Sequence, residues 1–191
     1  MSVTLEIRSE RYDSAVARRL DAEVQAEYLQ RYGGGDATVL AAEDFAPPAG
    51  GYFVGYDETG EPVASAAWRS HGDTDAEMKR VYVRADARGR GHARAMVAHV
   101  EADARAAGKH RMILETGDGQ PEAVALYASL GYVAITPFGY YAGEPGAFHL
   151  GKSLMADLSE VLPAAHAAGE ARSHGEQSEH QVIHITVNAA V

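Results

Sequence analysis

Residues 88–93 have the composition of a loop that binds a phosphorylated ligand. They read Arg88-Gly89-Arg90-Gly91-His92-Ala93 and separate a strand-forming stretch from a long amphipathic segment. Glycines at such a junction let the backbone approach a ligand closely, because no Cβ stands in the way. The first turn of the following helix would add unpaired N–H groups and a dipole that favours an anion. The sequence therefore predicts a main-chain cradle for a pyrophosphate, with arginines beside it.

Other glycine-rich phosphate loops do not fit this run. A Walker loop needs Gly-Lys followed by Ser or Thr, and a dinucleotide fingerprint starting at Gly89 needs a third glycine where the chain has Arg94. Nine of the 17 Lys and Arg residues lie between Lys79 and Arg111. We therefore expect a small polyanion to bind at one place, although a solvated basic helix face would give the same charge pattern.

The whole chain is acidic and lacks cysteine. Its 191 residues carry a formal net charge of -10 with no cysteine among them. This excludes a disulfide scaffold, a thiolate metal centre and a cysteine nucleophile. The charge argues against a nucleic-acid partner and favours a cationic substrate. No segment approaches the roughly 18 apolar residues of a membrane span, and the N-terminus lacks a signal-peptide layout. We expect a cytoplasmic protein without a membrane partner.

Hydrophobic periodicity predicts the elements that must position these residues. Strands are expected over residues 3–8, 52–56, 63–68, 77–84, 112–115, 132–135 and 148–154, and helices over residues 14–32, 93–108 and 121–130. Strands interleaved with helices in this order predict a mixed α/β layer architecture.

The compact domain is expected to cover residues 1–154, followed by an extension over residues 155–191. The extension holds five acidic residues, one arginine and four of the nine histidines. We expect residues 171–180 to be poorly ordered. Residues 182–187 have strand character and could pair with a sheet edge of the same chain or of a neighbouring copy, which would make a homodimer. The histidines lack metal-ligand spacing, so no metal is expected.

Two blocks of the sequence resemble the GCN5-related N-acetyltransferase (GNAT) family. Residues 88–93, which follow the strand at Val81–Val83, are similar to the family's acetyl-CoA motif: Gln or Arg, two residues, Gly, any residue, then Gly or Ala. The second block resembles the family's second conserved region through Gln120 (usually Asn), Ala123, Leu126, Tyr127 and Leu130-Gly131-Tyr132. The resemblance covers roughly residues 3–154. It implies a mixed, mostly antiparallel central sheet of about six to seven strands flanked by helices, with a C-terminal extension.

The resemblance also implies a set of residues that bind acetyl-CoA as co-substrate. The pyrophosphate would lie on main-chain amides of the loop, and the pantetheine arm would follow the preceding strand, where one N–H would polarise the thioester carbonyl. Arg88 would shape the loop, and His92 is expected to be a spacer. The expected cofactor-binding residues are Val81, Tyr82, Val83, Arg88, Gly89, Arg90, Gly91, His92, Ala93, Gln120 and Tyr127.

Acetyl transfer to an amine needs a base and an acid. A primary amine, with a pKa of about 10, must lose a proton before it attacks, and the departing thiolate must gain one. Tyr127 occupies the family's general-acid position, although a buried core tyrosine would fit the same helix. Glu77, 11 residues before Arg88, is the expected base. Glu115 and His149 are the alternatives.

The acceptor would be a small-molecule amine or a protein amino group. The resemblance places its site between residues 28–37 and the last hairpin, where Phe138-Gly139-Tyr140-Tyr141 and Glu144 would suit an organic cation. We predict an N-acetyltransferase that works by direct attack in a ternary complex, since no cysteine can carry the acetyl group. The alternatives are an acetyl-CoA-binding sensor or partner module without turnover, and an acylating toxin acting on charged tRNA, which the net charge disfavours.

Overall fold

A computed structural model describes residues 5–155 of the chain. The strands are β1 (Glu6–Glu10), β2 (Gly50–Tyr56), β3 (Pro62–His71), β4 (Asp75–Val83), β5 (Arg111–Gly117), β6 (Val133–Ala134) and β7 (Ala147–Ser153). The helices are α1 (Ala15–Tyr32), α2 (His92–Ala106) and α3 (Pro121–Ser129), with short 3-10 helices η1 (Ala42–Phe45) and η2 (Ala85–Ala87). The predictions for the C-terminal extension, including the strand over 182–187, lie outside the described residues.

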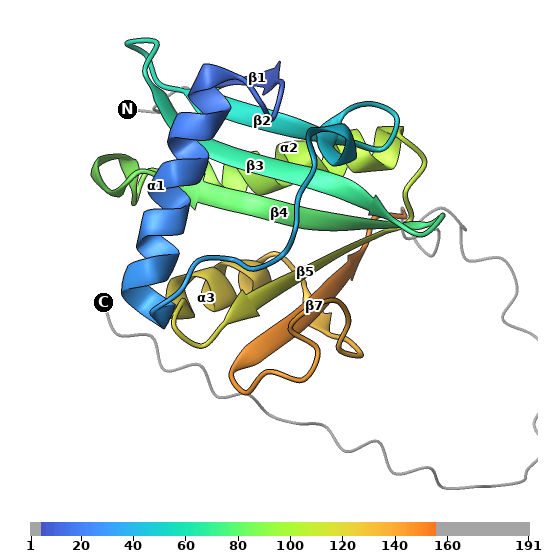
Figure 1. The fold of residues 1–191 in the computed structure, drawn as a ribbon. Coiled ribbons are helices and arrows are strands. Elements are labelled where there is room, and N and C mark those ends of the chain that lie inside the picture. The colour runs from blue at the N-terminus through green and yellow to red at the C-terminus, as the bar shows by residue number, and fades with distance from the viewer. Residues whose placement is uncertain (1–4, 156–191) are drawn as a thin grey trace, which may run out of the picture. The chain divides into compact units, whose positions relative to one another are not determined.

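The seven strands form one sheet in the order β1-β2-β3-β4-β5-β7-β6 (Figure 1). Only β4 and β5 run parallel; the other neighbours are antiparallel. This confirms the mixed, mostly antiparallel sheet. The strand predicted to end at Trp68 continues to His71, where it turns through Gly72 into β4. The prediction stopped at Trp68 because the apolar pattern ends at that residue. The hydrogen bonds between β3 and β4 continue beyond the hydrophobic core to His71.

Both ends of the first helix are capped. The Ser14 hydroxyl accepts a hydrogen bond from the N–H of Ala17 at 3.3 Å. It thereby satisfies one of the N–H groups that have no acceptor within the first turn of the helix. At the other end Gly33 adopts a φ of 73°, and its N–H donates to the carbonyl of Leu29. Glycine takes this left-handed conformation without steric cost. The caps therefore fix where the loop leaves α1 toward the site.

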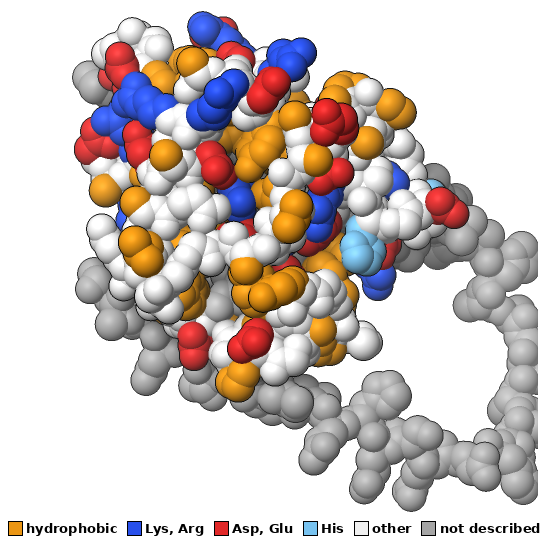
Figure 2. All heavy atoms as spheres, in the orientation of Figure 1, with side chains coloured by type: hydrophobic (Ala, Val, Ile, Leu, Met, Phe, Trp, Pro, Cys, Tyr) orange, Lys and Arg blue, Asp and Glu red, His pale blue; other side chains and the backbone are white. Residues whose placement is uncertain are grey.

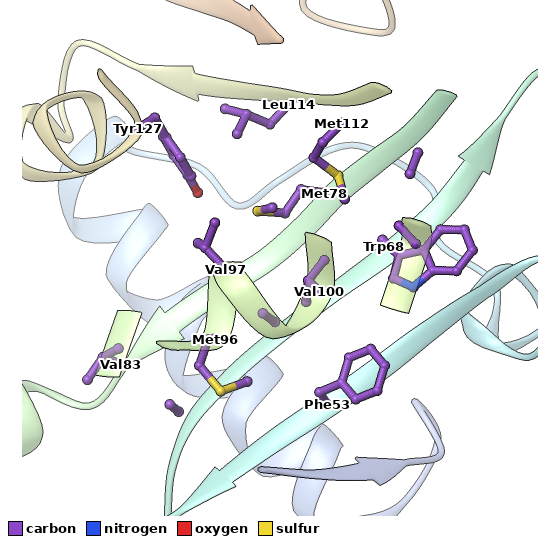
Figure 3. Close-up of a cluster of buried hydrophobic side chains, with 14 of the residues drawn as sticks. Phe53, Trp68, Met78, Val83, Met96, Val97, Val100, Met112, Leu114 and Tyr127 are labelled. Atoms are coloured by element: carbon purple, nitrogen blue, oxygen red, sulfur yellow. The ribbon is translucent and has the colours of Figure 1, made fainter. Parts of the chain in front are cut away.

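Two hydrophobic layers cover the two faces of the sheet. Alternate residues of a strand point to opposite faces, so Tyr52 and Phe53 belong to different layers. Phe53 and Trp68 belong to the layer that also contains side chains of α2 and α3 (Figure 3). Ala17 and Leu20 of α1 cover the other face (Figure 1). Within residues 5–155, none of the helices has the length and apolar character that crossing a bilayer requires.

The parallel strands β4 and β5 separate part-way along their length. They pair at only three positions, ending with Glu77 opposite Ile113, and then diverge (Figure 1). Beside the opening, β4 shifts its register against β3 between Ser65 and Ala67. The irregularity contains Arg80, whose φ is +56°, a rare value for a residue with a side chain. Because β5 diverges, backbone groups of β4 after Glu77 have no partner strand on the β5 side.

Candidate active site

Beyond their three paired positions, β4 and β5 leave an opening between them, which we call the splay. A cavity of about 570 Å³ lies in this splay. Its wall includes Lys79 and Val81 of β4, Glu115 of β5 and Tyr127 of α3, and it is completed by the end of α1 and the loop before β7. Tyr127 packs in the layer of α2 and α3. Because Met78 points into that same layer, its neighbour Lys79 points to the α1 face. The cavity is therefore lined from both faces of the sheet.

The loop before α2 has an open backbone. Gly89 and Gly91 have φ values of 75° and 83°, and no atom lies within 4 Å of the place where a Cβ would stand on either residue. Helix α2 begins at His92, so the N–H groups of its first turn have no acceptor within the helix. These features fit a pyrophosphate group, which needs close main-chain approach and a helix N-terminus.

Arg88 ties this loop to two other elements. Its Nε donates to the carbonyl of Val83 at 2.9 Å, and its guanidinium lies 2.5 Å from a carboxylate oxygen of Glu27 on α1. Glu27 also pairs with Arg31, which reaches Glu122 at the start of α3. A chain of alternating charges thus joins the glycine loop, α1 and α3 around the mouth of the splay.

Tyr127 is buried beside the cavity. Its side chain lies among the core residues (Figure 3) and contacts the ring of Tyr132 edge-on, with 5.4 Å between centroids. Burial, with a smaller contribution from Tyr28, raises the pKa of Tyr127 well above that of an ordinary phenol. Burial likewise raises the pKa of Tyr28, another cavity residue, to about 12. Both hydroxyl groups are therefore protonated at neutral pH and able to donate.

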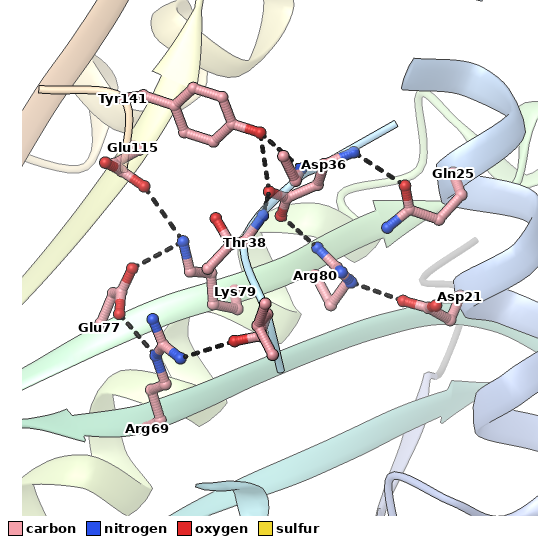
Figure 4. A network of polar contacts seen from close by, with 12 residues as sticks. Asp21, Gln25, Asp36, Thr38, Arg69, Glu77, Lys79, Arg80, Glu115 and Tyr141 are labelled. Carbon is pink, nitrogen blue, oxygen red and sulfur yellow. Dashed lines mark hydrogen bonds and ion pairs between the residues drawn. The ribbon is translucent and has the colours of Figure 1, made fainter. Parts of the chain in front are cut away.

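A buried ionic network crosses the splay (Figure 4). The Lys79 ammonium lies 2.6 Å from Oε1 of Glu77 and 3.2 Å from Oε2 of Glu115. Arg69, opposite Glu77 in the β3–β4 register, donates to Oε2 of Glu77 at 2.7 Å. Both oxygens of Glu77 are thus held by cations, and Glu77 is absent from the cavity wall, whereas Glu115 is part of it.

A second network builds the wall on the α1 side. Arg80 lies 2.5 Å from Asp21 of α1 and 2.6 Å from Asp36 of the following loop (Figure 4). The Tyr141 hydroxyl donates to Asp36 at 3.1 Å, so the loops after α1 and before β7 meet over the cavity. Burial acts to raise the pKa of Asp36, but the N–H of Thr38 and the guanidinium of Arg80 together lower it below its usual value.

The remaining wall is aromatic and acidic. Tyr32 and Tyr140 line it together with the carboxylates of Asp118 and Glu144. Among residues 5–155, neither Asp118 nor Glu144 takes part in an ion pair. The carboxylates of Glu77 and Glu115, by contrast, are both paired with Lys79. On the face shown in Figure 2, basic and acidic side chains are interspersed rather than gathered into one basic patch. The part of the wall that is free to receive a charged ligand is thus negative.

Comparison with known proteins identifies the fold and the family. The sequence profile of the acetyltransferase (GNAT) family matches residues 16–132, more than half of the chain. The chain belongs to this family. The GNAT match spans β2 to β5, the glycine loop and α3, so it includes both halves of the splay and Tyr127.

Individual GNAT relatives agree in fold and differ in sequence. An IAA acetyltransferase of Azospirillum brasilense is 38% identical over 78 residues, which cover 41% of this chain and 51% of the relative. The match thus spans about half the length of that protein. The structure of a candidate acyl-CoA N-acyltransferase from Klebsiella pneumoniae has a TM-score of 0.69 and 28% identity, covering 80% of this chain and 99% of that one. An aminoglycoside 6'-N-acetyltransferase solved with coenzyme A shares the fold, with a TM-score of 0.59 and 16% identity over 79% and 98% of the two chains.

The structure brings only part of the residue set expected for a GNAT enzyme to the cavity. Val81, Gln120 and Tyr127 line it. Tyr82 instead points toward α1, where its hydroxyl donates to Glu23 at 3.3 Å. His92 is buried beneath the loop, and its Nε2 has no hydrogen-bond partner in the described part of the chain.

Sequence reasoning did not single out three residues beside the cavity. Lys79, Arg80 and Asp36 organise the two ionic networks. Lys79 and Arg80 were not candidates, and Asp36 was expected only as part of the acceptor range 28–37. Lys79 gave a weak signal, since a buried lysine is rare without a partner and Glu77 stands two residues before it on the same face of the predicted strand. Nothing in the sequence indicated the positive φ of Arg80.

Proposed function

We propose that the protein is an N-acetyltransferase that moves the acetyl group of acetyl-CoA to a cationic primary amine by direct attack in a ternary complex. The observation that carries this is the cavity in the splay, where Tyr127 from one face of the sheet meets Lys79 and Glu115 from the other. Membership of the GNAT family supports the acetyl donor. When bound, acetyl-CoA would supply an activated acyl group and a thiolate leaving group.

The chain's own residues would perform the remaining tasks. The amides from Gly89 to Ala93 would hold the pyrophosphate, and the unpaired edge of β4 near Val81 would orient the pantetheine arm and donate an N–H to the thioester oxygen. Tyr127, kept protonated by burial, would donate its proton to the departing sulfur. The Arg88 contacts with Val83 and Glu27 would hold the loop in the binding shape.

Glu115 is the better-placed base of the two carboxylates. It lines the cavity, and its Oε1 is buried without a hydrogen-bond partner in the described structure. Glu77, the base expected from the sequence, stays a prediction, but its two oxygens already bind Lys79 and Arg69. Replacement of each by glutamine separates the two roles: we expect Glu115→Gln to lower kcat at least about 100-fold and Glu77→Gln to lower it much less.

The free carboxylates and tyrosines of the wall support a cationic acceptor. Asp118 and Glu144 would attract an ammonium group, and the faces of Tyr32 and Tyr140 would add cation–π contact. A cation is also favoured over an anion by the net charge of -10. We therefore place small organic amines first among acceptors, ahead of a protein amino group.

Thiol release from acetyl-CoA over a panel of amines, amino acids and aminoglycosides tests this proposal. The protein has no cysteine, so a thiol reagent reports coenzyme A alone. We expect turnover with one class of cationic amine and little with neutral or anionic amines. Tight acetyl-CoA binding in calorimetry without turnover on any amine would favour the non-catalytic module, and absence of binding would contradict the proposal altogether.

A further inference from the structure

Glu115 and His149 face each other inside the protein. They are directly opposite in the antiparallel register of β5 and β7, and Oε1 of Glu115 lies 3.7 Å from Nδ1 of His149. Only 8% and 4% of their side-chain surfaces are exposed. Cross-strand neighbours at this separation interact strongly when water is excluded.

The two facing atoms are both acceptors. His149 Nδ1 accepts the backbone N–H of Phe138 at 3.4 Å, so the proton of the neutral imidazole is on Nε2. Oε1 of Glu115 is buried and has no hydrogen-bond partner within the described residues, whereas Oε2 accepts from Lys79. Nδ1 has a single lone pair, which the long contact with the Phe138 N–H now uses. A proton shared between Nδ1 and Oε1 would replace that contact and give Oε1 the partner that it lacks.

Charged groups from β3, β4 and η1 lie around the pair. On β4, Lys79 binds both Glu77 and Glu115. Arg69 on β3 binds Glu77 and lies 3.5 Å from Asp44 of η1. From the loop before β7, Phe138 packs on His149 and Gly139 lies beside Glu115, and neither carries a charge.

One more histidine lies on the far side of Phe138. The ring of His71 packs against that of Phe138 at 5.4 Å between centroids. Among the described residues, the ionic cluster next to Glu115 thus holds two cations, Lys79 and Arg69, and two further carboxylates, Glu77 and Asp44.

We propose that Glu115 and His149 form a single proton-binding pair, which takes the proton that the acceptor ammonium must lose before it attacks acetyl-CoA. The inference rests on the proposed function. The N–H bond of the ammonium breaks with its electron pair left on nitrogen, and the Glu115 carboxylate takes the proton and holds it between Oε1 and Nδ1. His149 acts through Glu115 and is a positioning residue.

The later bond changes then balance. The amine nitrogen bonds to the acetyl carbon, and the carbon–sulfur bond breaks with its electron pair on sulfur. Tyr127 protonates the sulfur and recovers the second proton of the amine nitrogen. The pair returns the first proton to solvent, so each turnover yields an amide, a thiol and one released proton.

Nuclear magnetic resonance of the full chain with isotope-labelled histidine tests the pair without needing turnover. The His149 signals are those missing in His149→Gln, and Glu115→Gln supplies an amide donor in place of the absent proton. His99→Gln is the matched control, because His99 also packs edge-on against a phenylalanine, Phe53, but lies on α2 away from the cavity. Unchanged acetyl-CoA affinity in calorimetry shows that each variant is folded.

We expect the nitrogen shifts of His149 to place the proton of its neutral imidazole on Nε2 and none on Nδ1. In Glu115→Gln the Nδ1 shift should change, because an amide group then faces Nδ1 in place of the carboxylate. A neutral ring with its proton on Nδ1, or an Nδ1 shift that Glu115→Gln leaves unchanged, would overturn the pair.

Kinetics with the accepted amine test the catalytic part separately. The acid limb of the kcat profile should move in His149→Gln and stay in place in His99→Gln. An acid limb that His149→Gln does not move would reject the role in transfer. If the resonances behave as expected but no amine is acetylated, the proposed function fails while the proton-binding pair stands.

Discussion

The ammonium of Lys79 on β4 contacts Oε2 of Glu115 on β5 at 3.2 Å, at a level where the two strands no longer pair. Its second contact, 2.6 Å to Glu77, is on its own strand. Lys79 therefore connects two diverging strands through a side chain, in place of the missing ladder. Lys79 thus holds the two strands apart at a fixed separation. A site for acetyl transfer needs this, because the acetyl donor and the acceptor amine must meet there in a defined geometry.

This arrangement predicts a large stability loss on Lys79→Met. The variant would leave two buried carboxylates without their shared cation, and breaking a buried pair in this way costs about 3–5 kcal/mol. Lys152→Met is the control, since Lys152 pairs with Glu101 but is about a quarter exposed. Urea unfolding measures both. A Lys79→Met protein as stable as Lys152→Met would contradict the bridging role.

The glycine loop predicts that Gly91→Ala lowers acetyl-CoA affinity. Gly60 in the β2–β3 turn has nearly the same φ, 82° against 83°, and the same open surroundings. Alanine at either position therefore costs a similar strain, about 1–2 kcal/mol. Only at Gly91 does the added methyl group stand where the pyrophosphate should approach. Calorimetry should show at least about tenfold weaker binding for Gly91→Ala and wild-type binding for Gly60→Ala; equal affinities would argue against the cradle.

The Asp36 network predicts a pH dependence of stability. The pKa of Asp36 is lowered in the folded chain, so its contribution is complete above the ordinary carboxyl pKa of about 3.9 and is lost as the pH falls through the folded value. Thermal unfolding as a function of pH tests this against Asp36→Asn, which lacks the titrating group. The gap in Tm between wild type and variant should narrow below about pH 4. A gap that stays constant on acidification would be inconsistent with the ion pair to Arg80.

The acidic wall predicts a selective effect on the acceptor. Glu144→Gln should raise the KM for a cationic amine about 3–10-fold, because one carboxylate that attracts the ammonium is neutralised, and leave the KM for acetyl-CoA unchanged. Glu58→Gln, in the exposed β2–β3 turn, matches the charge change away from the cavity. Should the two variants give the same amine KM, Glu144 would not belong to the acceptor site.

The sequence could predict the parts of this molecule that depend on local chemistry. Glycines at 89 and 91 and the motif around Tyr127 could be recognised in the sequence, because each is a short run of residues close together in the chain. The site networks depend instead on strand register. Glu115 and His149 are neighbours only because β7 enters the sheet between β5 and β6. Glu77 was correctly expected on a strand, but its neutralisation by Arg69 follows from the β3–β4 register, which composition does not specify.

The measurement that tests the central claim most directly is kcat for Tyr127→Phe with the amine that the panel identifies. The variant keeps the buried ring and loses only the proton donor, so we expect kcat to fall about 100-fold or more while the affinity for acetyl-CoA and the melting temperature stay near wild type. Wild-type kcat in this variant would contradict the assignment of Tyr127 as the acid, and with it the account of the splay as the place of transfer.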